Sequence, residues 1–140
     1  MDGTALQEIA HGRAHELPAV GMEMPFGPGA EVAKVLGKMF LLLTEVRGTP
    51  VVVVKAEPRD AEALRSMHPE ITPGYHIDKR HWITLSPGGA FDKGFVRELV
   101  IVTDSYLLVV ETLPRARRPV DPGTFLAAEA EADRAAPSGT

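Results

Sequence analysis

Residues 30–55 read AEVAKVLGKMFLLLTEVRGTPVVVVK and predict three consecutive strands. Leu36-Gly37 and Arg47-Gly48 have the form of tight turns between antiparallel strands, because glycine readily adopts the positive φ that such turns require. The run of four valines that follows is β-branched and apolar on both faces of a strand, which is typical of a strand inside a sheet. The segment therefore predicts an antiparallel sheet with Val51–Lys55 in its middle.

Helices are predicted on both sides of this segment. A capping-box pattern that starts at Thr4 and a series of apolar residues at helical spacing predict a first helix over residues 4–16. Residues 22–26 then have the pattern of a short edge strand. Pro58 suits the first position of a further helix that continues to about His68.

The stretch from Asp92 to Leu113 is the most ambiguous part of the chain. Its LVIV and LLVV runs favour strands, but apolar side chains also recur at spacings of three and four, at Phe95, Leu99, Val102, Tyr106, Val110 and Leu113. A stripe of about six turns exceeds the usual length of a strand, so we predict a helix capped by Asp92. The predicted fold is α+β, with at least four antiparallel strands and helices packed on one face.

The chain should form one domain over residues 1–114, followed by a peripheral tail over residues 115–140. The tail begins with an arginine-rich stretch and continues with an Ala/Glu-rich segment that could hold a frayed helix around residues 124–134. Such a segment has little apolar surface to bury.

Composition limits the function classes. The 140 residues include no cysteine, which excludes disulfides and cysteine nucleophiles and fits a cytoplasmic protein. No apolar run approaches the roughly 18 to 20 residues of a membrane span. The net charge of -4 argues against a generic nucleic-acid binder. However, residues 34–118 hold 13 Lys/Arg and 10 acids, a net charge of +3 between acidic ends.

Residues 73–82 read PGYHIDKRHW and hold the densest group of side chains able to recognise a ligand. Pro73-Gly74 predicts a turn, so we expect a strand from about Tyr75 to Thr84. Alternation would place His76, Arg80 and Trp82 on one face of it, and Lys79 and His81 on the other. A strand with this many charges should meet solvent, a partner or a ligand.

This segment closely resembles the most distinctive motif of the MmcQ/YjbR family of small bacterial proteins. The similarity extends to MPFG at residues 24–27, KVLGKMF at 34–40, VVKAEP at 53–58 and SYLLV at 105–109. It implies a frataxin-like (CyaY-like) two-layer sandwich and a DNA-binding function. Family members usually carry Met-Asn where this chain has Ile77-Asp78. The substitution adds a negative charge beside Lys79 and Arg80.

Cations beside an indole suit a phosphate backbone and a stacked base, so the motif predicts a non-enzymatic DNA-binding site. Its expected residues are Lys79, Arg80, His81, Trp82, His76, Lys55, Lys38 and Lys34. One alternative is a pocket for a small molecule or a protein between this strand and the last helix, lined by Tyr75, Trp82 and Tyr106. Another is a tryptophan half-buried in the core under the Arg and Lys stems.

Other chemistry finds little support. His76 and His81 would lie on opposite faces of a strand and could not chelate one ion. Ser105 lies inside a predicted helix without oxyanion-hole glycines, where its hydroxyl should bond back to the preceding turn. The first helix is too weakly acidic for the iron handling that a frataxin-like fold suggests. We expect no cofactor, no metal and no enzymatic activity, and a monomer or weak homodimer.

Overall fold

A computed structural model describes residues 2–25, 29–74, 79–88 and 101–135 of the chain. Its elements are, in order, α1 (Gly3–Glu16), β1 (Val20–Glu23), β2 (Glu31–Val35), β3 (Lys38–Val46), β4 (Thr49–Lys55), α2 (Pro58–Met67), β5 (Ile71–Pro73), β6 (Trp82–Leu85), α4 (Ile101–Glu111), a 3-10 turn η1 (Arg115–Arg117) and α5 (Phe125–Ala135). The α+β prediction is confirmed.

Six strands form one antiparallel sheet in the order β1-β2-β3-β4-β6-β5. Both predicted turns are present, and their two central residues have positive φ, with values of 47° and 84° at Leu36-Gly37 and 53° and 81° at Arg47-Gly48. β4 lies inside the sheet, and its four valines are at most 1% exposed. The prediction of a central valine strand is therefore confirmed.

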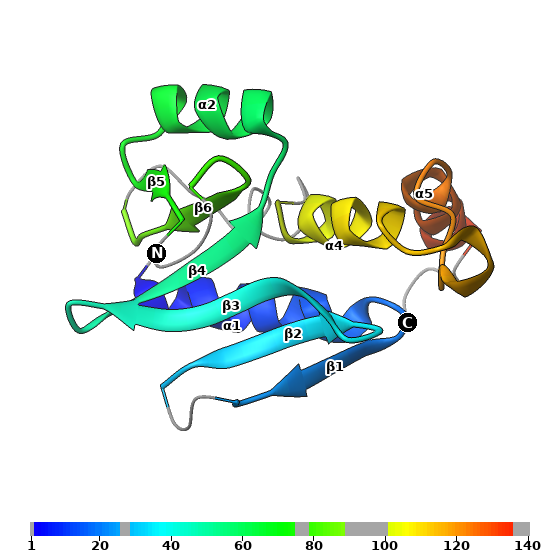
Figure 1. Cartoon of the computed structure of the whole chain (residues 1–140), viewed down its shortest axis with the longest axis horizontal. Helices are drawn as coiled ribbons and strands as arrows, with labels where there is room; N and C mark the ends of the chain where they lie inside the picture. The colour runs from blue at the N-terminus through cyan, green and yellow to red at the C-terminus, as the bar shows by residue number, and fades with distance from the viewer. Residues whose placement is uncertain (1, 26–28, 75–78, 89–100, 136–140) are drawn as a thin grey trace.

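Helices α1 and α4 cover one face of the sheet, and Figure 1 shows α1 behind the strands. The register pairs Leu41 with Val54 and Val54 with Ile83, across β3, β4 and β6. These three side chains lie on the face of the sheet that these helices cover. The apolar core lies between the two layers. α2 packs beside β5 at one end of the sheet.

The pairing of β3 with β4 ends at one side of the sheet, which leaves an opening between the two strands. A residue of α4 is hydrogen-bonded to both strands at this opening. The last register pair of these strands is Leu41 with Val54. One residue further on, the Ser105 hydroxyl donates a hydrogen bond to the Phe40 carbonyl at 2.5 Å and accepts one from the Lys55 amide at 2.8 Å. The prediction that Ser105 bonds back to its own helix is wrong, because these two strand groups need a partner.

The N-terminal segment differs from the prediction in its cap. Asp2, rather than Thr4, caps α1, and its carboxylate accepts a hydrogen bond from the Ala5 amide at 2.8 Å. The Gln7 side chain, which a capping box would use locally, instead donates to the carbonyls of Thr44 and Val51 at 2.8 and 2.9 Å. Hydrogen bonds to distant residues therefore replace the local capping bond of this side chain.

The predicted last helix is confirmed over Ile101–Glu111, while its predicted cap at Asp92 lies outside the described residues. Tyr106 is fully buried in it, and its ring packs edge-on against Phe40 with centroids 5.4 Å apart. Its hydroxyl donates to the Pro18 carbonyl at 2.8 Å. Burial raises the pKa of Tyr106 to about 12.

Residues 115–135, which we call the C-terminal arm, make contacts that the sequence did not predict. No residue of α5 is buried, in keeping with its small side chains. Phe125 nevertheless packs on Tyr106, with ring centroids 6.2 Å apart, and Glu129 forms an ion pair with Arg13 of α1. The arm therefore docks on the two helices that cover the sheet.

Candidate functional site

The described part of the PGYHIDKRHW motif forms a hairpin between β5 and β6. Pro73 belongs to β5 and pairs with Ile83, and the Gly74 amide donates to the Trp82 carbonyl at 2.9 Å. Lys79 and Arg80 lie in the turn, and β6 begins only at Trp82. The prediction of one strand from Tyr75 to Thr84 is therefore wrong at residues 79–81, and its start at Tyr75 lies outside the described residues.

The physical reason lies in the flanks of the motif. The apolar pairs Ile71–Leu85 and Pro73–Ile83 take the paired positions, and the described cations Lys79 and Arg80 lie outside the ladder. Gly74 lets the backbone at this position lie close to Trp82, since a Cβ there would lie 2.7 Å from Cβ of Trp82. Residues 75–78, which include Tyr75, His76 and Asp78, lie outside the described residues.

Only part of the predicted cationic set comes together. Lys55 is the register partner of Trp82, and the Ala56 amide donates to the His81 carbonyl, so the end of β4 adjoins the motif. Lys38 instead donates to the Thr112 hydroxyl at 3.2 Å, just past α4. Lys34 lies on β2 and forms an ion pair with Glu23 of β1 at 2.8 Å. Among the described members of the predicted set, Lys34 is therefore paired with an acid and lies apart on β2.

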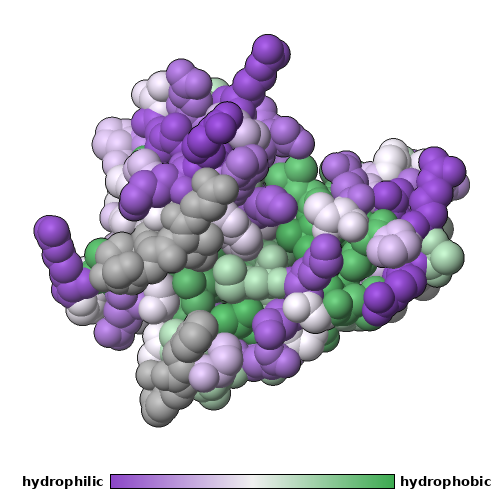
Figure 2. Space-filling view, viewed as in Figure 1, coloured by the Kyte–Doolittle hydropathy of each residue, from purple (hydrophilic) through white to green (hydrophobic). Residues whose placement is uncertain are grey.

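A groove lies between α2, α4 and the end of β4, and we call it the interhelical groove. One part has a volume of about 350 Å³ and is lined by Lys55, Ala56, Glu57, Asp60, Leu64, Ile101, Asp104, Leu107, Leu108, Glu111 and Pro122. An adjoining part of about 380 Å³ shares Lys55, Ala56, Glu57, Leu108 and Glu111, and adds Pro58, His81 and Thr112. Figure 2 shows apolar atoms at the base of the notch between the lobe of α2 and that of α5.

Helical spacing explains the lining. Ile101, Asp104, Leu108 and Glu111 are separated by three, four and three residues, which places them on one face of α4. Asp60 and Leu64 are four apart on α2 and share a face in the same way. The groove thus has an apolar floor and an acidic rim.

The electrostatics of the rim are one-sided. Among the lining residues, the carboxylates of Glu57, Asp60, Asp104 and Glu111 face a single lysine, Lys55, and the imidazole of His81. Within the described ranges, none of the four carboxylates forms an ion pair. Packing around the Asp104 carboxyl raises its pKa above the usual value, and the charge of Asp60 raises it further.

The pocket predicted from the sequence, between the motif strand and the last helix, has a different lining from this groove. The predicted pocket used the last helix, as the groove does, but Tyr106 is buried beneath the arm and Trp82 is not a lining residue. Asp104 and Glu111, seven residues apart in an otherwise uncharged helix, were the signal that could have indicated an acidic face.

The described residues contain no group of three or more His, Asp or Glu side chains placed to hold a metal ion. No helix in the same ranges has the length and apolar character needed to cross a membrane.

A family model described as YjbR matches residues 15–108. The uncharacterized protein YbdF of Escherichia coli O157:H7 is 40% identical over 124 residues, which cover 88% of this chain and all of that protein. The uncharacterized protein YjbR of Escherichia coli K12 is 34% identical over 85 residues, or 61% of this chain and 70% of that protein.

Two solved structures are similar in fold. The crystal structure of Deinococcus radiodurans protein DR2400 matches with a TM-score of 0.68 and 32% identity, covering 77% of this chain and 81% of that one. A Pseudomonas syringae protein matches with a TM-score of 0.60 over 73% of this chain and 96% of that one. Its 24% identity supports likeness of fold alone.

Proposed function

Because the chain belongs to the YjbR family, whose relatives above are named as uncharacterized, we propose a function from the chemistry of the interhelical groove. The protein is a non-enzymatic binding module of the cytoplasm. Its ligand is a small molecule with an apolar body and a cationic group. The apolar body packs on Leu64, Ile101 and Leu108, and the cationic group lies among the rim carboxylates.

The observation that carries this proposal is the set of four carboxylates that lie above an apolar floor and have no ion-pair partner in the described part of the chain. Carboxylates that share a groove repel one another, and a bound cation relieves that repulsion. A volume of about 350 Å³ lies at the lower end of the range for small-molecule sites. The same carboxylates would repel a phosphate backbone.

Asp104→Asn should weaken binding of 2-phenylethylammonium about 3- to 10-fold, or about 0.7–1.4 kcal/mol, because one rim charge is lost. Amide chemical shifts of α2 and α4 during titration measure the affinity. Glu45→Gln, at an exposed acid on β3, is the matched control and should bind like the unmodified protein. 3-Phenylpropionate, of similar size but opposite charge, should bind much more weakly than the ammonium.

The pH dependence has a defined sign. The pKa of Asp104 is raised, so its carboxylate is lost at a higher pH than that of an ordinary aspartate. Affinity for the cation should therefore fall as the pH falls through this raised pKa, and the fall should be smaller in Asp104→Asn. Equal binding of the ammonium and the carboxylate would contradict the proposal.

Nucleic-acid binding is the second candidate, because the turn exposes Lys79 and Arg80 close to the partly exposed Trp82. If the motif binds DNA, Lys79→Ala with Arg80→Ala should flatten the salt dependence by roughly two units of slope. Trp82 fluorescence during titration with single- and double-stranded DNA at several salt concentrations gives that slope. Arg59→Ala with Arg134→Ala removes two exposed cations elsewhere and is the control. Equal slopes for both double variants would count against the motif.

A further inference from the structure

The C-terminal arm begins by capping α4. The Arg118 guanidinium donates to the Leu113 carbonyl at 3.0 Å and to the Glu111 carbonyl at 2.9 Å. Glu111 is the last residue of α4 and Leu113 lies two residues beyond it, at the end where a helix lacks internal donors and favours positive charge. The start of the arm is thus held at the end of the helix that forms one side of the interhelical groove.

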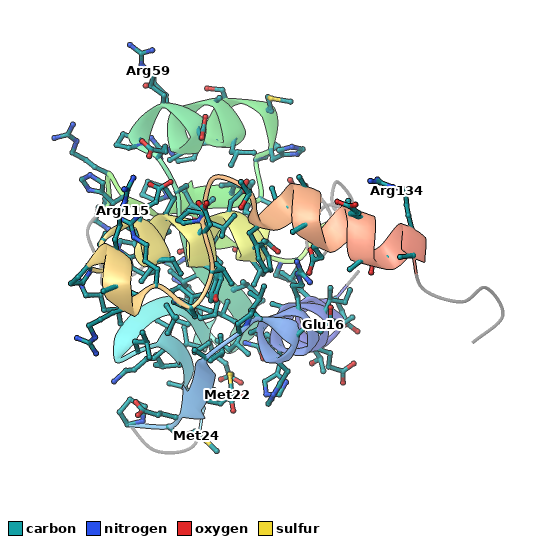
Figure 3. The ribbon with its side chains drawn as sticks, turned by 90° about the vertical axis from the view of Figure 1, so that its right-hand side faces the viewer. Glu16, Met22, Met24, Arg59, Arg115 and Arg134 are labelled. Carbon is teal, nitrogen blue, oxygen red and sulfur yellow. The ribbon has the colours of Figure 1, made fainter. Side chains whose placement is uncertain are left out.

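The far end of the arm is held by Glu129. Its two carboxylate oxygens accept hydrogen bonds from the two terminal nitrogens of Arg13 at 2.9 and 2.7 Å. Arg13 is only 6% exposed, and its Nε donates to the Thr103 hydroxyl of α4 at 2.8 Å. Figure 3 shows α5 lying above the end of α1, where Glu16 is labelled. A bidentate pair of this kind fixes orientation as well as distance.

Pro122 lies between these two attachments and is part of the lining of the interhelical groove. It is the one lining residue that the arm contributes. Because no residue of α5 is buried, the position of Pro122 depends on the attachments on either side of it. These are the Arg118 cap, the packing of Val120 and Phe125 against the core, and the Glu129–Arg13 pair.

We propose that the arm is a wall of the ligand groove, and that Glu129 and Arg13 are positioning residues that hold Pro122 against the bound ligand. This inference rests on the proposed function, since it assigns a wall and two positioning residues to the same groove. Coupling between two sites is reciprocal, so a ligand that contacts Pro122 must also stabilise the docked arm.

The test uses the full-length chain with 2-phenylethylammonium as the probe. Pro122→Ala, which removes the ring from the groove and leaves the Arg13 pair intact, should weaken binding roughly 2- to 5-fold. Glu129→Gln should weaken it by a similar factor, because a neutral amide holds the guanidinium less firmly. Glu131→Gln changes an exposed acid of the same helix and should bind like the unmodified protein.

A second readout separates positioning from general destabilisation. Saturating probe should slow amide hydrogen exchange in α5 of the unmodified protein, and the slowing should be smaller in Pro122→Ala. The probe could bind, with an affinity that Asp104→Asn lowers but Pro122→Ala and Glu129→Gln leave unchanged. In that case the arm does not form a wall of the groove, and only this inference is overturned. If the unmodified protein does not bind the probe, both the proposed function and this inference are contradicted.

Discussion

Replacing Glu129 with alanine is expected to destabilise the protein by about 2–4 kcal/mol. The change leaves the Arg13 guanidinium, only 6% exposed, with Thr103 and Glu16 as its remaining partners. Burial lowers the pKa of Arg13, but hydrogen bonds and charge from Glu129 and Glu16 outweigh burial and raise it overall. The guanidinium therefore stays charged, and a buried charge that loses its main partner is costly.

Denaturant unfolding, followed by circular dichroism, measures this loss. Glu131→Ala removes an exposed carboxylate from the same helix and should change stability by less than about 0.5 kcal/mol. The double variant Arg13→Met with Glu129→Met should recover much of the loss, since apolar residues of similar volume often replace a buried pair without cost. A destabilisation below 0.5 kcal/mol for Glu129→Ala would support the sequence-based expectation that the tail is peripheral.

Ser105→Ala should cost about 2–4 kcal/mol, because it leaves two backbone groups without a partner at the opening between β3 and β4. The Phe40 carbonyl and the Lys55 amide both bond to the Ser105 hydroxyl, which is fully buried. The alanine side chain cannot replace either bond, and the small cavity it leaves has little room for water.

Ser66 offers a matched control on α2. Its hydroxyl bonds to the Glu62 carbonyl at 3.0 Å on an exposed surface, and Ser66→Ala should change stability by less than about 0.5 kcal/mol. Thermal and denaturant unfolding of the two variants give the comparison. Equal stability of Ser105→Ala and Ser66→Ala would show that the strand groups find other partners.

Sequence reasoning succeeded where one local signal controls the outcome. The glycine turns and the valine run determine pairing through positive φ and β-branching, and these effects act within a few residues. It failed where distant partners decide. Gln7 bonds to Thr44 and Val51, and Ser105 to Phe40 and Lys55, more than 35 residues away in each case.

The candidate site shows the same limit. The composition of the motif indicated recognition, but charge density alone could not show that Lys34 is neutralised by Glu23 or that Lys55 adjoins four carboxylates. The acids of the groove lie on α2 and α4 and at Glu57 just before α2, and these two helices are far apart in the chain. Their proximity follows from topology, which residue spacing does not reveal.

The two outermost strands have a consequence for self-association. β1 has four residues and β5 has three, and β5 ends in Pro73, which has no amide hydrogen to offer a new neighbour. Short edges and edge prolines discourage the addition of strands from other molecules, the first step toward aggregates. At high concentration we therefore expect this sheet to resist growth at its ends, so that crowding alone does not convert the fold into fibres.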